Sequence, residues 1–262
     1  MIRSLWTAAT GMVVQQKNLD VIANNIANVN TSGYKTSRAG FQELMYQTMR
    51  MAGTRTEQGN QVPTGIQIGM GALLASVEKL FVQGDFQQTQ NQLDLSVQGA
   101  GFFQITLPTG DKAYTRAGSF QTDSQGRVVT PDGYLLEPAI TIPQGATATS
   151  VEADGTVSVT VQGQSKPQQL GTIQLATFMN QAGLSAMGKN LFVETDASGT
   201  PIVGSPGQNG VGTLQQGYLE MSNVDIVQEM VNMIIAERAY ETNSKAIQAA
   251  NDMLQIANNV RR

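Results

Sequence analysis

Acidic side chains in the middle of the sequence are the groups best suited to catalysis. Glu137, Glu152 and Asp154 could supply the two carboxyls, a fixed distance apart, that hydrolyse a glycosidic bond. The sequence does not give that distance, so this reading stays an alternative. Asp123 and Asp132 flank a turn and could be imagined as Ca²⁺ ligands, but the repeated acids of a calcium loop are missing. We interpret both as ordinary turn residues.

Other catalytic and metal-binding groups are absent from the sequence. The 262 residues contain no His and no Cys, which excludes Ser-His-Asp and Cys-His catalysis, thiolate metal sites and disulfides. Gly69 and Gly71 are too few glycines for a phosphate-binding loop. We therefore expect no enzyme activity, no catalytic residue, no cofactor and no bound metal.

The charge pattern limits the possible partners. The chain has 16 basic and 20 acidic residues, a net charge of −4, without a run of either sign. Such a surface is a poor match for nucleic acid or an anionic membrane, and no apolar run approaches the roughly 18 residues of a membrane span. Residues 5–14 are too polar, with Thr7, Thr10 and Gly11, for a signal peptide. We expect no nucleic-acid binding, no membrane insertion and no cleaved signal peptide.

The two ends of the chain differ from its middle. All eight Pro lie between positions 63 and 206, and no Gly or Pro follows Gly217. At both ends apolar residues recur at every seventh position, as in the seam of a coiled coil. The N-terminal stripe contains Leu5, Met12, Leu19 and Ile26, interleaved with Ala8, Gln15, Ile22 and Val29. The C-terminal stripe contains Ile226, Met233, Tyr240, Ile247 and Leu254, interleaved with Ala236, Asn243, Ala250 and Ala257.

These stripes predict long terminal helices that pair. Ser222 and Asp225 fit a capping box at the start of the second helix. Both stripes are narrow, and they hold residues such as Gln15 and Asn243 where the core of a monomer would have large apolar side chains. We expect them to pack against each other or against other subunits. Burial in the core of a single globular monomer is the alternative.

Alternating apolar residues predict short strands in the middle of the chain. Leu93, Leu95 and Val97 form one such run, and turn signals such as Asp132-Gly133 separate the runs. The expected class is α+β, with coiled-coil helices in 1–36 and 220–262 and an inserted antiparallel β domain, a sandwich or barrel, in 76–219. For residues 37–75 we predict an extended or hairpin-like connector.

Longer motifs in the chain resemble those of the bacterial flagellar rod and hook proteins. The most specific one is Ala-Asn-Asn-Ile-Ala-Asn-Val-Asn-Thr-Ser-Gly-Tyr-Lys at 23–35. It contains the residues Asn24, Asn25, Asn28, Asn30, Gly33 and Tyr34. Further matching segments are 99–104, 114–120, 131–134, 217–225, 230–234, 237–241 and 244–247. The resemblance therefore covers essentially the whole chain.

Within this family the length and the opening residues 4–8 are most like those of distal rod subunits. The resemblance implies a structural subunit that assembles with copies of itself into a rigid helical tube and transmits motor torque to the hook. The resemblance then implies subunit contacts at nine seam residues, namely Leu5, Met12, Leu19, Ile26, Ile226, Met233, Tyr240, Ile247 and Leu254. The stretch 46–63, with Gly53, Gly59 and Pro63, resembles an insert that stiffens distal rods. Asn28 and Asn30 could either end the first helix or bond to a neighbouring subunit.

The same resemblance implies partners and a location. The partners are the chain itself, proximal rod proteins and hook proteins at the ends of the polymer, the surrounding basal-body ring proteins, and the flagellar export apparatus, which passes the chain unfolded. The location is the rod of the basal body in the periplasmic space. Three alternatives stay open, namely another axial subunit of the proximal rod or hook, a rod-associated cell-wall hydrolase, and a secreted adhesin.

Overall fold

The computed structural model describes residues 2–53, 63–161, 166–208 and 210–260. The chain forms two compact units. The helical unit contains the described parts of Met1–Ala27, Ser37–Glu78 and Asp225–Arg262. The β unit contains the described parts of Asn28–Thr36 and Lys79–Val224. Each unit is thus assembled from segments that are far apart in the sequence.

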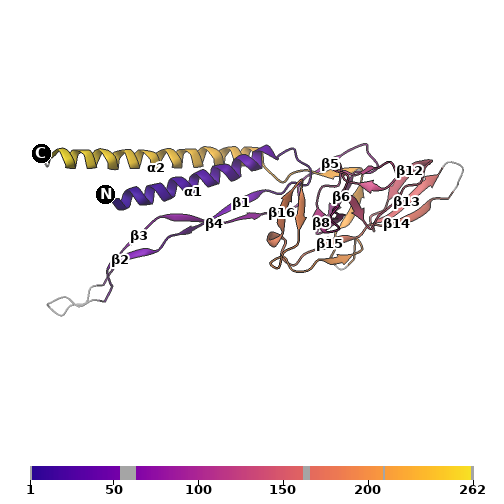
Figure 1. The fold of residues 1–262 in the computed structure, drawn as a ribbon, viewed down its shortest axis with the longest axis horizontal. Helices are drawn as coiled ribbons and strands as arrows, with labels where there is room; N and C mark the ends of the chain where they lie inside the picture. The colour runs from indigo at the N-terminus through magenta and orange to yellow at the C-terminus, as the bar shows by residue number, and fades with distance from the viewer. Residues whose placement is uncertain (1, 54–62, 162–165, 209, 261–262) are drawn as a thin grey trace. The chain divides into compact units, whose positions relative to one another are not determined.

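Two long helices lie in the helical unit, as the uninterrupted stripes predicted. α1 (Ile2–Ala27) has 26 residues and α2 (Ile226–Val260) has 35, so their lengths are about 39 Å and 52 Å. The two helices lie side by side (Figure 1). Their pairing is observed, whereas the supercoil of a coiled coil stays a prediction. Within the described residues, neither helix combines the length and the apolar composition of a membrane span.

The N-terminus of α2 has a different cap from the predicted one. Oδ1 of Asp225 accepts hydrogen bonds from the backbone N–H groups of Val227 at 2.9 Å and Gln228 at 3.1 Å, which makes Asp225 the N-cap. The Ser222 hydroxyl accepts a bond from the N–H of Val224 at 3.4 Å instead. A capping box with Ser222 as the cap is therefore wrong, because the carboxylate expected in the first turn is itself the cap.

The connector forms a two-stranded arm in the helical unit (Figure 1). Its strand pairs are β1 (Ser37–Glu43) with β4 (Ala72–Lys79) and β2 (Tyr46–Arg50) with β3 (Ile66–Gly69). β2 and β3 are antiparallel, with Tyr46 opposite Gly69. Between the two pairs, the N–H of Leu44 donates to the carbonyl of Gly71 at 2.8 Å. The backbone pairing therefore continues along the arm.

The β unit consists of antiparallel strands, as the alternation predicted. Its largest sheet has nine strands within the described residues. The main path runs through β16 (Ser185–Gly188), β17 (Leu191–Val193), β8 (Lys112–Thr115), β7 (Phe102–Thr106), β11 (Leu135–Glu137), β10 (Val128–Val129) and β9 (Gln121–Thr122). β15 (Leu175–Thr177) also pairs with β7, and β18 (Ile202–Gly204) pairs with β15. This sheet contributes Phe103, Ile105 and Leu136, among others, to the main apolar core.

Smaller sheets complete the β unit. One has the order β12 (Ala146–Val151), β13 (Thr156–Val161), β14 (Gln168–Thr172). Two pairs are β19 (Thr213–Gln216) with β6 (Leu95–Gln98) and β20 (Tyr218–Glu220) with β5 (Phe86–Gln88). A short 3₁₀ helix, η1 (Gln181–Gly183), precedes β16.

The sheets share a core but do not close. Phe103 and Leu136 from the large sheet pack in one cluster with Val157 of β13 and with Val97 and Leu214 of the β6–β19 pair. The path of the large sheet ends at β16 and β9. The α+β class is confirmed, and the barrel among the predicted alternatives is wrong, because the strands at the two ends of the path do not pair with each other.

Candidate assembly interface

Small side chains mediate the contact between α1 and α2. Ala8, Ala236 and Ala250 are buried. At Gly11 the helices approach so closely that an added Cβ would lie 2.9 Å from Nδ2 of Asn243. These residues, apart from Gly11, belong to the interleaved positions of the two stripes. Their small or polar character suits two helices that approach closely within one chain.

The nine predicted seam residues keep part of their surface accessible. Leu5, Met12, Leu19, Ile26, Met233, Ile247 and Leu254 are half-buried, while Ile226 and Tyr240 are exposed. These large side chains are therefore only partly covered within their own unit, whereas Ile22, at an interleaved position of the N-terminal stripe, is buried. The accessible part leaves surface for a second subunit, and contact with one stays a prediction.

A broader apolar surface lies on the first turns of α2. Val227, Met230, Val231, Ile234 and Ile235 are all exposed in the helical unit, Val227 by 72%. They form two adjacent rows along the helix, at spacings of four residues. The heptad pattern did not select them, since they flank the stripe. Seven of the ten residues from 226 to 235 are apolar, and this density was the signal that could have found them.

The arm also exposes apolar side chains. Every residue of β2 is exposed, and so are the side chains Met45, Tyr46, Met49, Met51, Ile66, Ile68 and Met70. An isolated two-stranded ribbon is marginally stable in water. On one side the arm contacts α1, where an added Cβ at Gly71 would meet Oγ1 of Thr10. Much of its remaining apolar surface is uncovered.

The insert residues singled out in the sequence fall near the arm's tip. Gly53 has φ = +82° and no atom within 4 Å of an added Cβ. Pro63 is exposed. Gly59 lies outside the described residues. The backbone at position 53 adopts a left-handed conformation, which favours glycine. Open space surrounds this position.

Asn25 of the N-terminal motif is a structural residue inside the helical unit. Its side chain is buried, its Nδ2 donates to the carbonyl of Ser37 at 2.8 Å, and its Oδ1 accepts from the N–H of Ser37 at 2.9 Å. The carboxyl of Glu229 on α2 also bonds to Asn25, and burial raises the pKa of that carboxyl. Asn25 thereby connects α1, β1 and α2. Asn24, the preceding residue, is exposed.

The motif continues into the β unit. Oδ1 of Asn28 accepts from the Thr31 hydroxyl at 3.2 Å, and Asn30 is exposed. Gly33 has φ = +71°, and an added Cβ would lie 2.5 Å from the backbone nitrogen of Ala117. Only glycine fits there without displacement of the β unit's backbone. Tyr34 is buried, with Nζ of Lys79 4.7 Å from the centre of its ring.

A buried charge triad lies beside this motif. Nζ of Lys35 donates to Oε1 of Glu220 at 2.6 Å, and Nε of Arg116 donates to Oε2 of Glu220 at 2.8 Å. All three side chains are buried. Burial lowers the pKa of Lys35, although the neighbouring Glu220 acts in the opposite direction. The triad connects residues from the N-terminal, middle and C-terminal motifs, and sequence reasoning missed this pairing.

Asn223 ties the same region together. Its Oδ1 accepts from the N–H and the hydroxyl of Thr36 at 2.8 Å and 2.7 Å, and its Nδ2 donates to the carbonyls of Leu80 and Val82 at 2.9 Å and 3.1 Å. One amide thus bonds to segments that are more than 140 residues away in sequence. Both polar atoms of the Asn223 side chain therefore form their hydrogen bonds inside the β unit.

Most of the five acidic residues considered for catalysis or for Ca²⁺ binding take part in local structure. Glu137 pairs with Lys112 at 2.8 Å, and Asp132 pairs with Lys189 at 3.3 Å. A hydrogen bond from Arg127 is the main cause that lowers the pKa of Asp123. The N–H of Thr156 does the same for the pKa of Asp154. The fifth residue, Glu152, is exposed. No cluster of metal-ligating side chains is present among the described residues.

Comparison with known proteins identifies the family. Three family models match: "Flagella basal body rod protein" at residues 5–35, "Flagellar hook protein FlgE/F/G D1 domain" at 96–159, and "Flagellar basal body rod FlgEFG protein C-terminal" at 215–260. Similar over nearly their whole lengths are proteins described as flagellar basal-body rod protein FlgG. The one from Caulobacter vibrioides is 51% identical over 99% of this chain and 100% of its own. Those from Borreliella burgdorferi and Buchnera aphidicola (Schizaphis graminum) are each 50% identical, over 100% and 97% of this chain and 100% and 98% of their own.

These matches agree with the motifs found in the sequence and with the helix–β–helix order of the fold. They establish a structural flagellar component and not an enzyme. The chain therefore belongs to the FlgG family of flagellar basal-body rod proteins, whose members are structural subunits of the distal rod.

Proposed function

We propose that the chain polymerises with copies of itself into the rigid helical tube of the distal rod, which transmits motor torque to the hook. The observation that carries this proposal is the exposed apolar surface of the helical unit. It includes the two rows on α2 and both faces of β2. An apolar surface of this extent is typical of a protein–protein interface. A repeated contact between different surfaces of identical subunits generates a helical polymer.

The nine seam residues form one part of the proposed interface. Seven of them are half-buried, and Ile226 adjoins the exposed rows. A neighbouring helix would cover these residues together with the rows. We propose that the contact buries both sets, so the interface is wider than the heptad stripe alone.

The arm forms the other part. Its strands β2 and β3 expose apolar side chains that their own unit leaves uncovered. A neighbouring subunit that covers them would fix the arm and hinder the sliding between subunits that a curved tube requires. We propose that residues 46–63, including Gly53, Gly59 and Pro63, stiffen the rod in this way.

Membership in a basal-body rod family supports a proposal for the remaining partners and the location. We propose that the polymer adjoins proximal rod proteins at one end and hook proteins at the other, inside the ring proteins of the basal body. The location would be the periplasmic space. The chain would reach it unfolded through the flagellar export apparatus, without a cleaved signal peptide.

A substitution on an exposed row tests self-assembly with little effect on the subunit's own fold. Ile235 is 62% exposed, so Ile235→Asp should leave the monomer's circular dichroism unchanged and prevent sedimentable polymer. Gln248→Asp adds the same charge at an exposed polar position of α2 and should polymerise. Normal tubes from Ile235→Asp would refute the proposed row contact. Ile247→Asp and Leu254→Asp test the seam, with loss of motility as the readout.

A further inference from the structure

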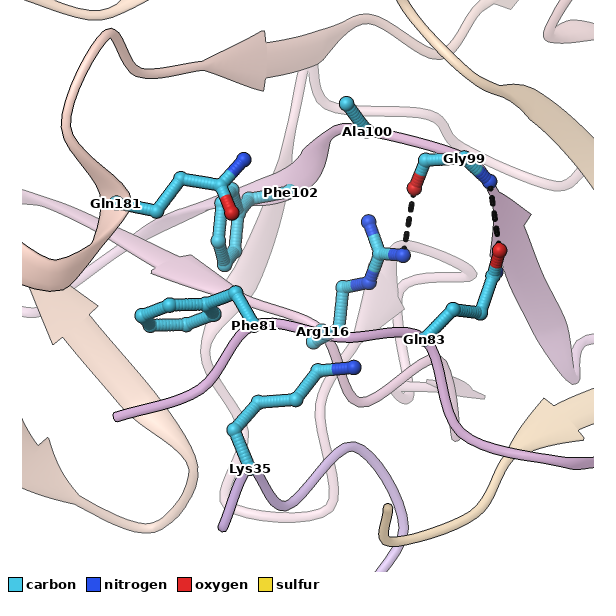
Figure 2. A pocket seen from close by; sticks show the side chains of 8 residues that line it. All are labelled: Lys35, Phe81, Gln83, Gly99, Ala100, Phe102, Arg116 and Gln181. Carbon is cyan, nitrogen blue, oxygen red and sulfur yellow. Dashed lines mark hydrogen bonds between the residues drawn. The ribbon is translucent and has the colours of Figure 1, made fainter. Parts of the chain in front are cut away.

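A pocket in the β unit has two buried cations in its wall (Figure 2). It holds about 510 Å³ of empty space, part of it open to solvent. Lys35 and Arg116 line it together with Phe81, Gln83, Phe102 and Gln181. The ion pairs with Glu220 explain why the two cations are held in place. They do not explain why the two cations border a cavity.

The charges around the pocket do not balance. Lys35 and Arg116 share the carboxylate of Glu220, and neither cation pairs with another acid among the described residues. One positive charge is therefore in excess. Backbone carbonyls accept further bonds, from Lys35 at Val82 and from Arg116 at Gly99, but they carry no net charge. A buried cation without a full counter-charge is costly.

Some N–H groups of the residues that line the pocket are also left without an acceptor in the described parts of the chain. The bonds of Lys35 to Glu220 and Val82 use two of its three N–H groups. Arg116 uses four of its five, on Glu220 and on the carbonyls of Val97, Gly99 and Gly101. The side-chain amide of Gln181, which faces the pocket in Figure 2, has no hydrogen-bond partner in the described parts of the chain. These groups together suit a carboxylate, which accepts several bonds and carries one negative charge.

The residues next to the pocket favour a protein ligand. Val82, between the lining residues Phe81 and Gln83, is 66% exposed, and Met179, two residues before Gln181, is 91% exposed. Apolar side chains that flank a charged group are typical of a protein interface. The chain has a net charge of −4, so copies of it repel one another unless local contacts compensate. A positive pocket provides such a contact.

We propose that this pocket binds an acidic side chain of a second copy of the chain. The inference rests on the proposed self-assembly and specifies one of its contacts. Five exposed acids form neither an ion pair nor a side-chain hydrogen bond in the described parts of the chain: Asp85, Glu152, Asp196, Glu237 and Asp252. The occupant is one of these five. Its carboxylate accepts the remaining N–H groups of Lys35 and Arg116 and the amide of Gln181.

A substitution at Gln181 tests the proposal without touching the triad. Gln181→Glu places a carboxylate of the same subunit at the pocket and should exclude the neighbour's acid. The matched control is Ala182→Glu, at an exposed position of the same 3₁₀ helix that does not line the pocket. We expect Gln181→Glu to raise the free subunit concentration in equilibrium with polymer by at least about tenfold, because like charges then face each other. Ala182→Glu should change it by less than about twofold.

The outcomes separate this inference from the proposed function. If the parent chain forms no polymer, the proposed function fails. If the parent and Gln181→Glu polymerise equally well, only the pocket assignment fails. Each of the five acids is next replaced by its amide in the Gln181→Glu background. Recovery of polymer in one of them identifies the occupant, and recovery in none refutes an occupant from a second copy.

A titration with acetate, with chloride as control, distinguishes a free carboxylate ligand. Acetate should shift the NMR signals of Gln181 and Gly99 in the monomer only weakly, since the pocket's apolar flank stays uncovered. Saturable shifts that Gln181→Glu abolishes, together with unchanged polymerisation of that variant, would assign the pocket to a small free carboxylate and overturn the proposal.

Discussion

Replacement of Glu220 by Gln is the sharpest test of how the β unit is held together. Glu220 is buried and is the shared partner of Lys35 and Arg116. Its Oε1 also accepts the N–H of Gly84 at 3.1 Å. A Gln side chain has nearly the same size, but its amide nitrogen must face one of the two cations and cannot accept its hydrogen bond.

The expected cost follows from the charges that remain. Removal of one member of a buried ion pair costs about 3–5 kcal/mol, because the other member stays buried without its counter-charge. Here two cations lose the same partner. We expect the free energy of unfolding of the β unit to fall by at least about 3 kcal/mol, a large fraction of the 5–15 kcal/mol that is usual for a domain.

Urea unfolding followed by near-ultraviolet circular dichroism measures this loss, since the aromatic cluster around Phe102 lies in the same unit. The control is Glu241→Gln on α2, whose partners Arg238 and Lys245 are exposed, and it should have little effect. Addition of Lys35→Met to Glu220→Gln removes one unpaired cation and should restore part of the stability. A loss below about 1 kcal/mol, or no recovery in the double variant, would refute the reasoning.

Three further substitutions and one deletion probe other parts of the chain. Gly33→Ala should destabilise the β unit by about 2–3 kcal/mol in the same assay, because its Cβ would lie 2.5 Å from the backbone nitrogen of Ala117. Gly53→Ala, which meets no atom within 4 Å, should cost about 1 kcal/mol at most. Burial, with Glu194 nearby, raises the pKa of Tyr114 from 10.0 to about 12. At a pH between these two pKa values, the folded state binds more protons at Tyr114 than the unfolded state does. The free energy of unfolding should therefore fall as the pH rises through this interval, and Tyr114→Phe should remove that decline. Deletion of residues 46–63 should give bent tubes in electron micrographs, and tubes as straight as the parent's would show that the insert does not stiffen them.

The heptad stripes predicted the two helices and their pairing but not which residues lie closest between them. Stripes are recognised by large apolar residues, and of these Leu19 and Met233 are only half-buried. The distance between the helices depends instead on Gly11, Ala236 and Ala250, because small side chains allow close approach. A heptad also selects one narrow face, and it therefore missed Ile234 and the other exposed apolar residues of the first turns of α2.

The buried triad could not be predicted from residue types. Lys35, Arg116 and Glu220 would each be expected at the surface, and 185 residues separate the first from the last. All three lie within the motifs that carried the family resemblance, which was the one available signal. Likewise, alternation identified strands such as Phe102–Thr106 but not the open edges of the sheet, because the pattern along a strand specifies which face is buried and not which strands pair.

The chain connects its two units after residues 27, 36, 78 and 224, and this suits a subunit that bears load. Within the helical unit, Asn25 bonds to Ser37 and to Glu229, so residues beside three of these positions are tied together. Within the β unit, Asn223 bonds to Thr36 and Leu80, beside three of the same positions. A load that passes between the units is therefore distributed over several covalent connections whose ends are fixed by buried or half-buried amides. A single linker would bear the same load alone.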